Sequence, residues 1–261
     1  MKESELIFGL MAAFNKPEYT IQDLIYLIKP FHVSESSLRT TLSRMSNRGV
    51  LQSKREGRRA FYRFTAKGSA ISNNVARSFI SPDWSQWDES YWGILFSIPE
   101  INKNLRHKIR KKLSAFRFAP LHPGFWFRPF NAIEKIKLVL KDIFNNKNCQ
   151  VIKFTQFKAA FHNDIDRLWH LKKINDGFCK GAQLIKKKRQ KMKNLSPKQA
   201  LVEKMAVGEK VVKALFKDPL LPPVLLPEDW QGHNLRAAFL KWDQDITQLA
   251  RPYWVKILKN N

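Results

Sequence analysis

Residues 36–65 read SSLRTTLSRMSNRGVLQSKREGRRAFYRFT, a stretch in which hydroxyl and arginine side chains recur at helical spacing before a glycine and a basic segment. Leu38, Leu42 and Met45 follow one another at intervals of four and three residues, which predicts one buried face of a helix over 35–48. The opposite face of that helix carries short polar side chains and arginines. The stretch therefore predicts an amphipathic helix with an unusually small-residue polar face.

The second half of the same stretch has the pattern of a β-hairpin. Val50 and Leu51 predict one short strand and residues 61–64 predict a second. Between them, residues 53–60 predict a turn that carries several basic side chains around Gly57. A basic hairpin is thus expected directly after the helix.

Two further amphipathic helices are predicted upstream, over 4–14 and 21–28, the second opened by a capping box at Thr20 and Asp23. Three helices and a hairpin are the order of a winged helix-turn-helix DNA-binding domain, which we assign to residues 1–80. In such a domain short donors and arginines on the third helix reach base edges, and the hairpin contacts backbone. The predicted DNA-binding residues are Ser36, Ser37, Arg39, Thr40, Ser43, Arg44, Asn47, Lys54, Arg55, Arg58 and Arg59.

The rest of the chain completes an α+β fold class. Residues 81–160 are predicted to form a ferredoxin-like dimerisation domain, with strands over 91–96, 124–127 and 151–157 and helices over 104–116 and 132–144. Residues 161–261 are predicted to form a helical C-terminal domain, with helices over 163–174, 177–193, 197–217 and 235–259.

The whole chain is strongly basic, with 47 Lys+Arg against 22 Asp+Glu and a net charge of +25 over 261 residues. A surplus of this size favours a polyanionic partner such as double-stranded DNA, with a merely solubilising surface as the alternative. The densest segment, KKKRQKMK over 186–193, holds six basic residues, and contact with DNA or with solvent alone both remain open. Two cysteines and no stretch of ~20 apolar residues predict a cytoplasmic protein without a membrane partner.

The sequence does not predict an enzyme. His162, Asp164, Asp166 and His170 form the densest group of titratable residues, but their spacing is typical of surface hydrogen bonds on a helix. A nuclease built on the middle domain would need an acidic metal ligand where Ser97 stands. We therefore predict no catalytic residue, no metal and no cofactor.

Three blocks of the sequence resemble the PaaX family, the bacterial repressors of phenylacetic acid degradation. The blocks are LRTTLSRMSNRGVLQSKREGRRAFYRFT, then WGILFSIPE with LRHKIRKKLSAFRFAPLHPGFWFRP, then LFKDPLLPPVLLPEDWQGHNLRAAF. The resemblance implies a homodimeric transcriptional repressor of phenylacetate catabolism whose middle domain has the fold of the small CRISPR adaptation nuclease subunit. It also implies release from a palindromic operator by an aryl-acetyl-CoA thioester, phenylacetyl-CoA in the best-known members.

An acyl-CoA effector needs basic groups for its phosphates and an apolar, aromatic-lined pocket for its acyl group. The predicted effector-binding residues are Trp126, Arg128, Trp169, Lys172, Trp230 and Arg236. Ordinary core packing is the alternative for each tryptophan. A second function class is a nonspecific nucleic-acid-binding protein without a metabolite effector, which the sequence preference of binding at physiological salt would distinguish.

Overall fold

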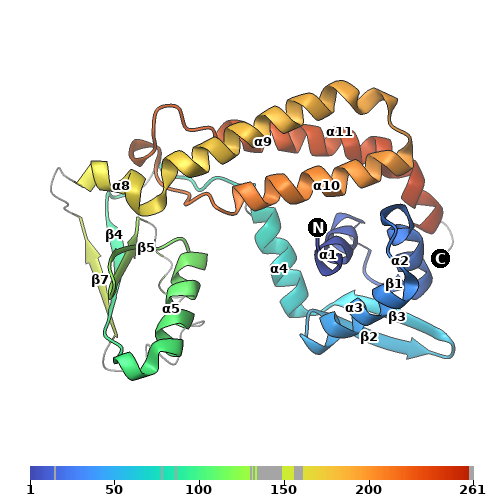
Figure 1. Cartoon of the computed structure of the whole chain (residues 1–261), viewed down its shortest axis with the longest axis horizontal. Coiled ribbons are helices and arrows are strands. Elements are labelled where there is room, and N and C mark those ends of the chain that lie inside the picture. Colours follow the sequence, from blue (N-terminus) through green and yellow to red (C-terminus); the bar gives the residue numbers. More distant parts are fainter. Residues whose placement is uncertain are drawn as a thin grey trace. The chain divides into compact units, whose positions relative to one another are not determined.

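The computed structural model describes residues 1–14, 16–77, 79–85, 87–129, 131, 133, 149–155 and 161–258. Figure 1 shows the chain with its helices and strands labelled. Contacts divide it into two compact units: unit 1 holds Met1–Ile80, Gly177–Phe216 and Gln231–Asn261, and unit 2 holds Ser81–Asp176 and Lys217–Trp230. The units do not follow chain order, and the three predicted domains stay a prediction.

The N-terminal part of unit 1 has the predicted order of three helices and a hairpin. Its elements are α1 (Glu3–Phe14), β1 (Tyr19–Thr20), α2 (Ile21–Ile28), the 3-10 turn η1 (Lys29–Phe31), α3 (Glu35–Asn47), β2 (Leu51–Glu56), β3 (Arg59–Phe64) and α4 (Ala66–Arg77). The strands form an antiparallel sheet in the order β1-β3-β2. This is the winged helix-turn-helix arrangement that the sequence predicts.

Local sequence signals account for the start and the buried face of α3. The hydroxyl of Ser34 accepts a hydrogen bond from the backbone N–H of Ser37 at 3.2 Å, so Ser34 is the N-cap. Leu38 and Leu42 are fully buried and Met45 is nearly so. Their burial fixes the rotation of α3, and with it the side chains that face solvent.

The hairpin differs from its prediction in the length of its strands. β2 and β3 pair from Leu51 with Phe64 as far as Glu56 with Arg59, so the turn holds only Gly57 and Arg58. Gly57 has a φ of 58°, the conformation that the first position of a two-residue hairpin turn often requires. Most of the residues predicted as a turn over 53–60 are therefore strand residues.

The C-terminal helices of the chain are α9 (Leu171–Lys191), which belongs to unit 1 from Gly177 on, the 3-10 turn η3 (Met192–Asn194), α10 (Pro197–Leu215) and α11 (Gly232–Leu258). Of these, α10 and α11 pack against the N-terminal helices of unit 1. A Cβ on Gly9 of α1 would lie 2.6 Å from Met205 Cε of α10, and Tyr253 of α11 stacks on Tyr26 of α2. Residues near the two ends of the chain thus share one core.

The break between α8 (Phe161–Trp169) and α9 differs from the prediction, which placed it between 174 and 177. His170 has a φ of 55° and ends α8. The carboxylate of Asp166 accepts a hydrogen bond from the backbone N–H of Lys172 at 2.9 Å, which satisfies an otherwise unpaired donor at the start of α9. Asp166 therefore has a structural role where α8 ends and α9 begins.

Unit 2 contains a four-stranded antiparallel sheet in the order β5-β6-β4-β7. Its elements are β4 (Tyr91–Phe96), η2 (Glu100–Asn102), α5 (Lys103–Ala115), β5 (Ala119–His122), β6 (Phe125–Arg128), β7 (Cys149–Phe154), α8 and the 3-10 turn η4 (Pro223–Leu225). α5 covers one face of the sheet, and residues of α8 and of 221–230 cover the other. The central domain is ferredoxin-like, as predicted.

Two central-domain predictions need qualification. β5 was not predicted, because its four residues include Pro120 and an irregular register against β6. The predicted helix over 132–144 lies outside the described residues apart from residue 133. In the described part of the chain, no helix is both long and apolar enough to cross a membrane.

Candidate nucleic-acid interface

The polar face of α3 is a continuous exposed stripe. Ser36, Thr40, Ser43 and Asn47 are separated by four, three and four residues, so they lie on one side of the helix opposite the buried leucines. All four are exposed. The hydroxyl of Thr40 donates to the carbonyl oxygen of Ser36 at 3.0 Å, which keeps this side chain close to the helix surface. The stripe can therefore approach another surface closely.

Two arginines flank this stripe, one on each side. Arg39 and Arg44 are exposed, and helical geometry places them on opposite edges of the line formed by the four short side chains. Neither forms an ion pair within the described part of the chain. Their guanidinium groups are thus available to bidentate acceptors such as phosphates or guanine edges.

Ser37 belongs to a different environment from the other predicted contacts. Its hydroxyl donates to the Glu3 carboxylate at 2.6 Å, and the Thr41 hydroxyl donates to the same oxygen at 3.1 Å. Glu3 lies at the start of α1, so this carboxylate fastens α3 to α1. We assign Ser37 to the support of α3 rather than to its outer face.

The basic residues of the hairpin separate onto two faces. Directly paired residues share a face, so Lys54 and Arg59 lie on one side of the hairpin and Arg55 on the other. Arg58 occupies the turn. Lys54 pairs with Glu56 at 2.5 Å, a hydrogen bond that raises the pKa of the lysine. The arginines therefore supply the unpaired charge of the hairpin.

Two exposed arginines near these elements were not predicted as contacts. Arg48 directly follows α3, and its carbonyl oxygen accepts a hydrogen bond from Lys67 Nζ at 2.6 Å. Arg63 lies on β3, where its guanidinium donates twice to the side-chain oxygen of Gln52 at 3.1 and 2.9 Å. Arg48 is next to Asn47 in the sequence, which was the available signal, whereas the position of Arg63 opposite Gln52 follows only from the register of β2 and β3.

The six predicted effector-binding residues are divided between the two units and, within unit 2, between the two faces of the central sheet. Trp126 is buried on the α5 face of the central sheet. Trp169 and Trp230 belong to the cluster on the opposite face, where Trp169 Nε1 donates to the carbonyl oxygen of Arg117 at 3.1 Å. Lys172 is exposed at the start of α9, and Arg236 is buried in unit 1. Trp126 and Trp169 are buried and Trp230 is partly buried, and each packs in a hydrophobic cluster of unit 2.

Arg128, the remaining member of that set, is also a structural residue. Its guanidinium donates to the carbonyl oxygen of Phe116 and lies over the ring of Phe118, 5.7 Å from its centroid. Burial, and next the charge of Arg117, lower the pKa of Arg128 to about 9. A guanidinium in this setting is not available to a phosphate from solvent.

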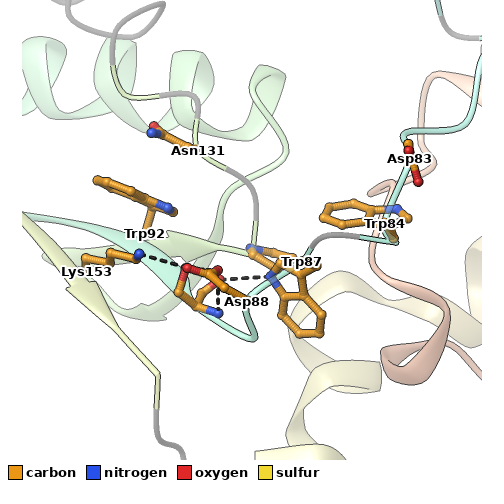
Figure 2. A pocket seen from close by; sticks show the side chains of 9 residues that line it. Asp83, Trp84, Trp87, Asp88, Trp92, Asn131 and Lys153 are labelled. Atoms are coloured by element: carbon orange, nitrogen blue, oxygen red, sulfur yellow. Dashed lines mark hydrogen bonds and ion pairs between the residues drawn. The ribbon is translucent and has the colours of Figure 1, made fainter.

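A hollow of about 320 Å³ lies elsewhere on unit 2 and is lined by three indoles. Figure 2 shows Trp84, Trp87 and Trp92 around it, with Lys153 reaching Asp88 between the last two. The lysine and the carboxylate are 2.9 Å apart, and Lys153 also lies 5.7 Å from the centroid of the Trp92 ring. None of these residues was predicted from the sequence as a site residue.

Two carboxylates line this hollow, Asp83 and Asp88, and the second is held in its charged form by its neighbours. Hydrogen bonds from Lys153, and next from Ser90, lower the pKa of Asp88 to about 2. The charge of Lys153 is thereby balanced, and the aromatic surface is left as the main recognition element. Among the described residues, no three His, Cys, Asp or Glu side chains are placed to hold a metal ion.

Comparisons with known proteins give matches along most of the chain. Family models match as "PaaX-like protein" over residues 5–68, "PaaX protein central Cas2-like domain" over 84–165 and "PaaX-like protein C-terminal domain" over 169–256. The transcriptional repressor PaaX of Escherichia coli (strain K12) is 25% identical over 252 residues, which cover 94% of this chain and 79% of that protein.

A solved structure shares the fold. The uncharacterized protein Rv0674 from Mycobacterium tuberculosis superposes with a TM-score of 0.58 at 21% identity, covering 89% of this chain and 90% of that one.

Proposed function

Because this chain belongs to the PaaX family, we propose that it is a transcriptional repressor that binds operator DNA as a homodimer and is released by an acyl-CoA effector. The observation that carries the DNA-binding part is the exposed stripe of α3 between two unpaired arginines, followed by an arginine-bearing hairpin. The name of the relative from Escherichia coli supports repression.

The stripe of α3 suits the major groove in size and in chemistry. A groove about 12 Å wide admits a helix whose outer side chains are short, and Ser36, Thr40, Ser43 and Asn47 are all short. Arg39 and Arg44 at its edges would read guanine edges or fix the helix on phosphates. The arginines of the hairpin would contact the neighbouring backbone irrespective of sequence.

A homodimer would place two copies of α3 on successive half-sites of an inverted repeat. The central sheet offers β5 and β7 as its outer strands for pairing between copies. Selection of bound fragments from randomised DNA at about 150 mM salt tests this arrangement, because nonspecific binding is weak there. An inverted repeat is the expected result. Recovery of no motif would support the nonspecific nucleic-acid-binding alternative.

Substitutions separate base reading from backbone contact. Arg44→Ala should weaken binding to the selected site by about 1–3 kcal/mol if Arg44 reads a base, and should relax specificity there. Replacing Arg58 and Arg59 by Ala should weaken selected and scrambled sites equally. Arg251→Ala, which removes an exposed charge from α11, is the matched control and should change neither. Unchanged operator binding by Arg44→Ala would remove that residue from the interface.

For the effector, we place the aryl group in the hollow formed by Trp84, Trp87 and Trp92, in place of the residues predicted from sequence. An aryl ring stacked on indoles gains about 0.5–1.5 kcal/mol per pair beyond simple burial. Titration with phenylacetyl-CoA should therefore show several-fold weaker binding to Trp84→Leu. The control is Trp230→Leu, because Trp230 was predicted from the sequence to bind the effector but does not line the hollow. Weaker binding only in Trp230→Leu would contradict the placement.

A further inference from the structure

The inner face of α9 is fixed against the other C-terminal helices. Phe178, Ile185 and Met192 follow one another at seven-residue intervals and are all buried. A Cβ on Gly181 would lie 3.1 Å from Leu235 Cδ1, which shows how closely α9 approaches α11. The rotation of α9, and therefore the direction of its remaining side chains, is set by this packing.

The basic run over 186–193 divides into two groups by its partners. Lys188 forms an ion pair with Glu203 of α10 at 2.6 Å, and Arg189 forms one with Asp245 of α11 at 2.9 Å. These two cations flank the buried face and connect α9 to its neighbours. They are therefore structural.

The other lysines of this part of the chain point outward. We define the α9 lysine face as five exposed residues, four in α9 and the last in η3, that form no ion pair within the described residues: Lys180, Lys186, Lys187, Lys191 and Lys193. The uncharged Gln183 and Gln190 are exposed between them. No carboxylate from residues 177–194 is interspersed.

A helix face of this composition is unfavourable for the isolated protein. Lys187 and Lys191 are four residues apart, a like-charge spacing that destabilises a helix, and no acid three or four residues away offsets it. A face that only contacts water gains nothing from this repulsion. Phosphates in register with the lysines would reverse its sign.

The α9 lysine face is separate from the proposed operator-binding elements. Figure 1 shows α9 on the side of α10 away from α1 and α3. α10 contacts α1 and η1, whereas α9 has no comparable contact with the described N-terminal helices. DNA bound along α3 and the hairpin would leave this face uncovered.

We propose that the α9 lysine face binds the phosphate backbone of a second DNA duplex, so that one protein molecule bridges two duplexes. Lysines act on phosphates as point charges without sequence preference, which suits an anchoring surface. From Lys180 to Lys191 the helix rises by about 16 Å, a length over which duplex DNA presents about nine phosphates. The bridging rests on the proposed operator binding, whereas backbone binding by α9 does not.

The test uses the full chain with two DNA probes. A selected duplex on beads is saturated with protein and washed, and retained protein is quantified. A fluorescent duplex of scrambled sequence is then added over a series of salt concentrations. The variant carries Gln at all five lysines of the α9 lysine face. Its matched control carries Gln at five exposed lysines elsewhere: Lys2, Lys29, Lys111, Lys210 and Lys241.

We expect the α9 variant and its matched control both to stay on the bead-bound duplex, and we expect the control to capture the second duplex normally. The α9 variant should capture it about tenfold less, and the salt dependence of capture should fall by roughly 0.9 in slope for each phosphate that the variant no longer neutralises. Equal capture by both variants would overturn the proposal, and would indicate bridging through the two α3 helices of a dimer. Failure of every protein to stay on the beads would instead contradict the proposed operator binding.

A second measurement removes the dependence on the operator. Arg39→Ala, Arg44→Ala, Arg55→Ala, Arg58→Ala and Arg59→Ala together remove the arginine contacts that we propose for α3 and the hairpin, so the α9 lysine face is the main proposed DNA-binding surface that is left. This variant should retain salt-sensitive binding to the scrambled duplex, and adding the five Gln substitutions should abolish it. Retained binding after both sets of changes would overturn the assignment to α9.

Discussion

At the scale of single residues, the position of α3 depends on Glu3. Its carboxylate accepts hydrogen bonds from Ser37 and from Thr41, whose side chain is buried. Glu3→Ala leaves two hydroxyls without this acceptor and should lower the free energy of unfolding by about 1–2 kcal/mol. Urea denaturation measures the change, and Glu228→Ala, at an exposed site of unit 2, should stay within about 0.5 kcal/mol of the parent. An unchanged midpoint in Glu3→Ala would show that α3 is held by its apolar face alone.

The residue scale also shows what a local pattern can predict of a site. The spacing of Ser36, Thr40, Ser43 and Asn47 was enough to place them on one exposed face of α3. Ser37 was also predicted as a contact, because its partner Glu3 lies 34 residues away and a local pattern could not reveal their hydrogen bond. Residues held by distant partners therefore need the structure to be assigned.

At the scale of elements, the hairpin turn depends on a glycine with positive φ. Gly57 has a φ of 58°, and a Cβ there would meet no atom within 4 Å, so Gly57→Ala should act through backbone strain alone. We expect it to lower the free energy of unfolding by about 1 kcal/mol. Gly208 inside α10 also has open space around its missing Cβ, and Gly208→Ala should instead raise stability by about 0.5–1 kcal/mol. Equal effects of the two substitutions on thermal denaturation would contradict this account.

Elements differed in how far the sequence could define them. α3 was predicted closely because one face is buried and the other is exposed, which gives a clear period. β2 was predicted too short because all its residues after Leu51 are exposed, so no alternation of apolar and polar side chains marks the strand. His170 gave no clear sequence signal for the end of α8, since a positive φ is uncommon in any residue other than glycine.

At the scale of the whole molecule, contacts between the ends of the chain were beyond local patterns. The N-terminal amino group lies 3.5 Å from the Glu209 carboxylate, and Lys213 lies 3.1 Å from that of Glu5. The sequence predicted the N-terminal helices over 4–14 and 21–28 and the C-terminal helices over 197–217 and 235–259, but it assigned the two pairs to separate domains. Packing of α1 and α2 on α10 and α11 joins them into unit 1 instead. Changes in the C-terminal helices should therefore reach the proposed DNA-binding elements directly.

The C-terminal end of α11 allows that coupling to be measured. Trp254 is buried, and the centroid of its ring lies 4.4 Å from the ring centroid of Phe14. The Tyr253 hydroxyl donates a hydrogen bond to the carbonyl oxygen of Tyr26 at 3.0 Å. Trp254→Ala should lower the free energy of unfolding of unit 1 by about 3 kcal/mol, because the packing of a large buried ring is removed.

Hydrogen exchange shows which elements of unit 1 lose stability when the packing of Trp254 is removed. If α1, α2 and α11 unfold together, their amides should all exchange faster in Trp254→Ala, whereas amides of the central sheet should be unaffected. Faster exchange confined to α11 would show that its end frays independently, and that the N-terminal helices are stable without it.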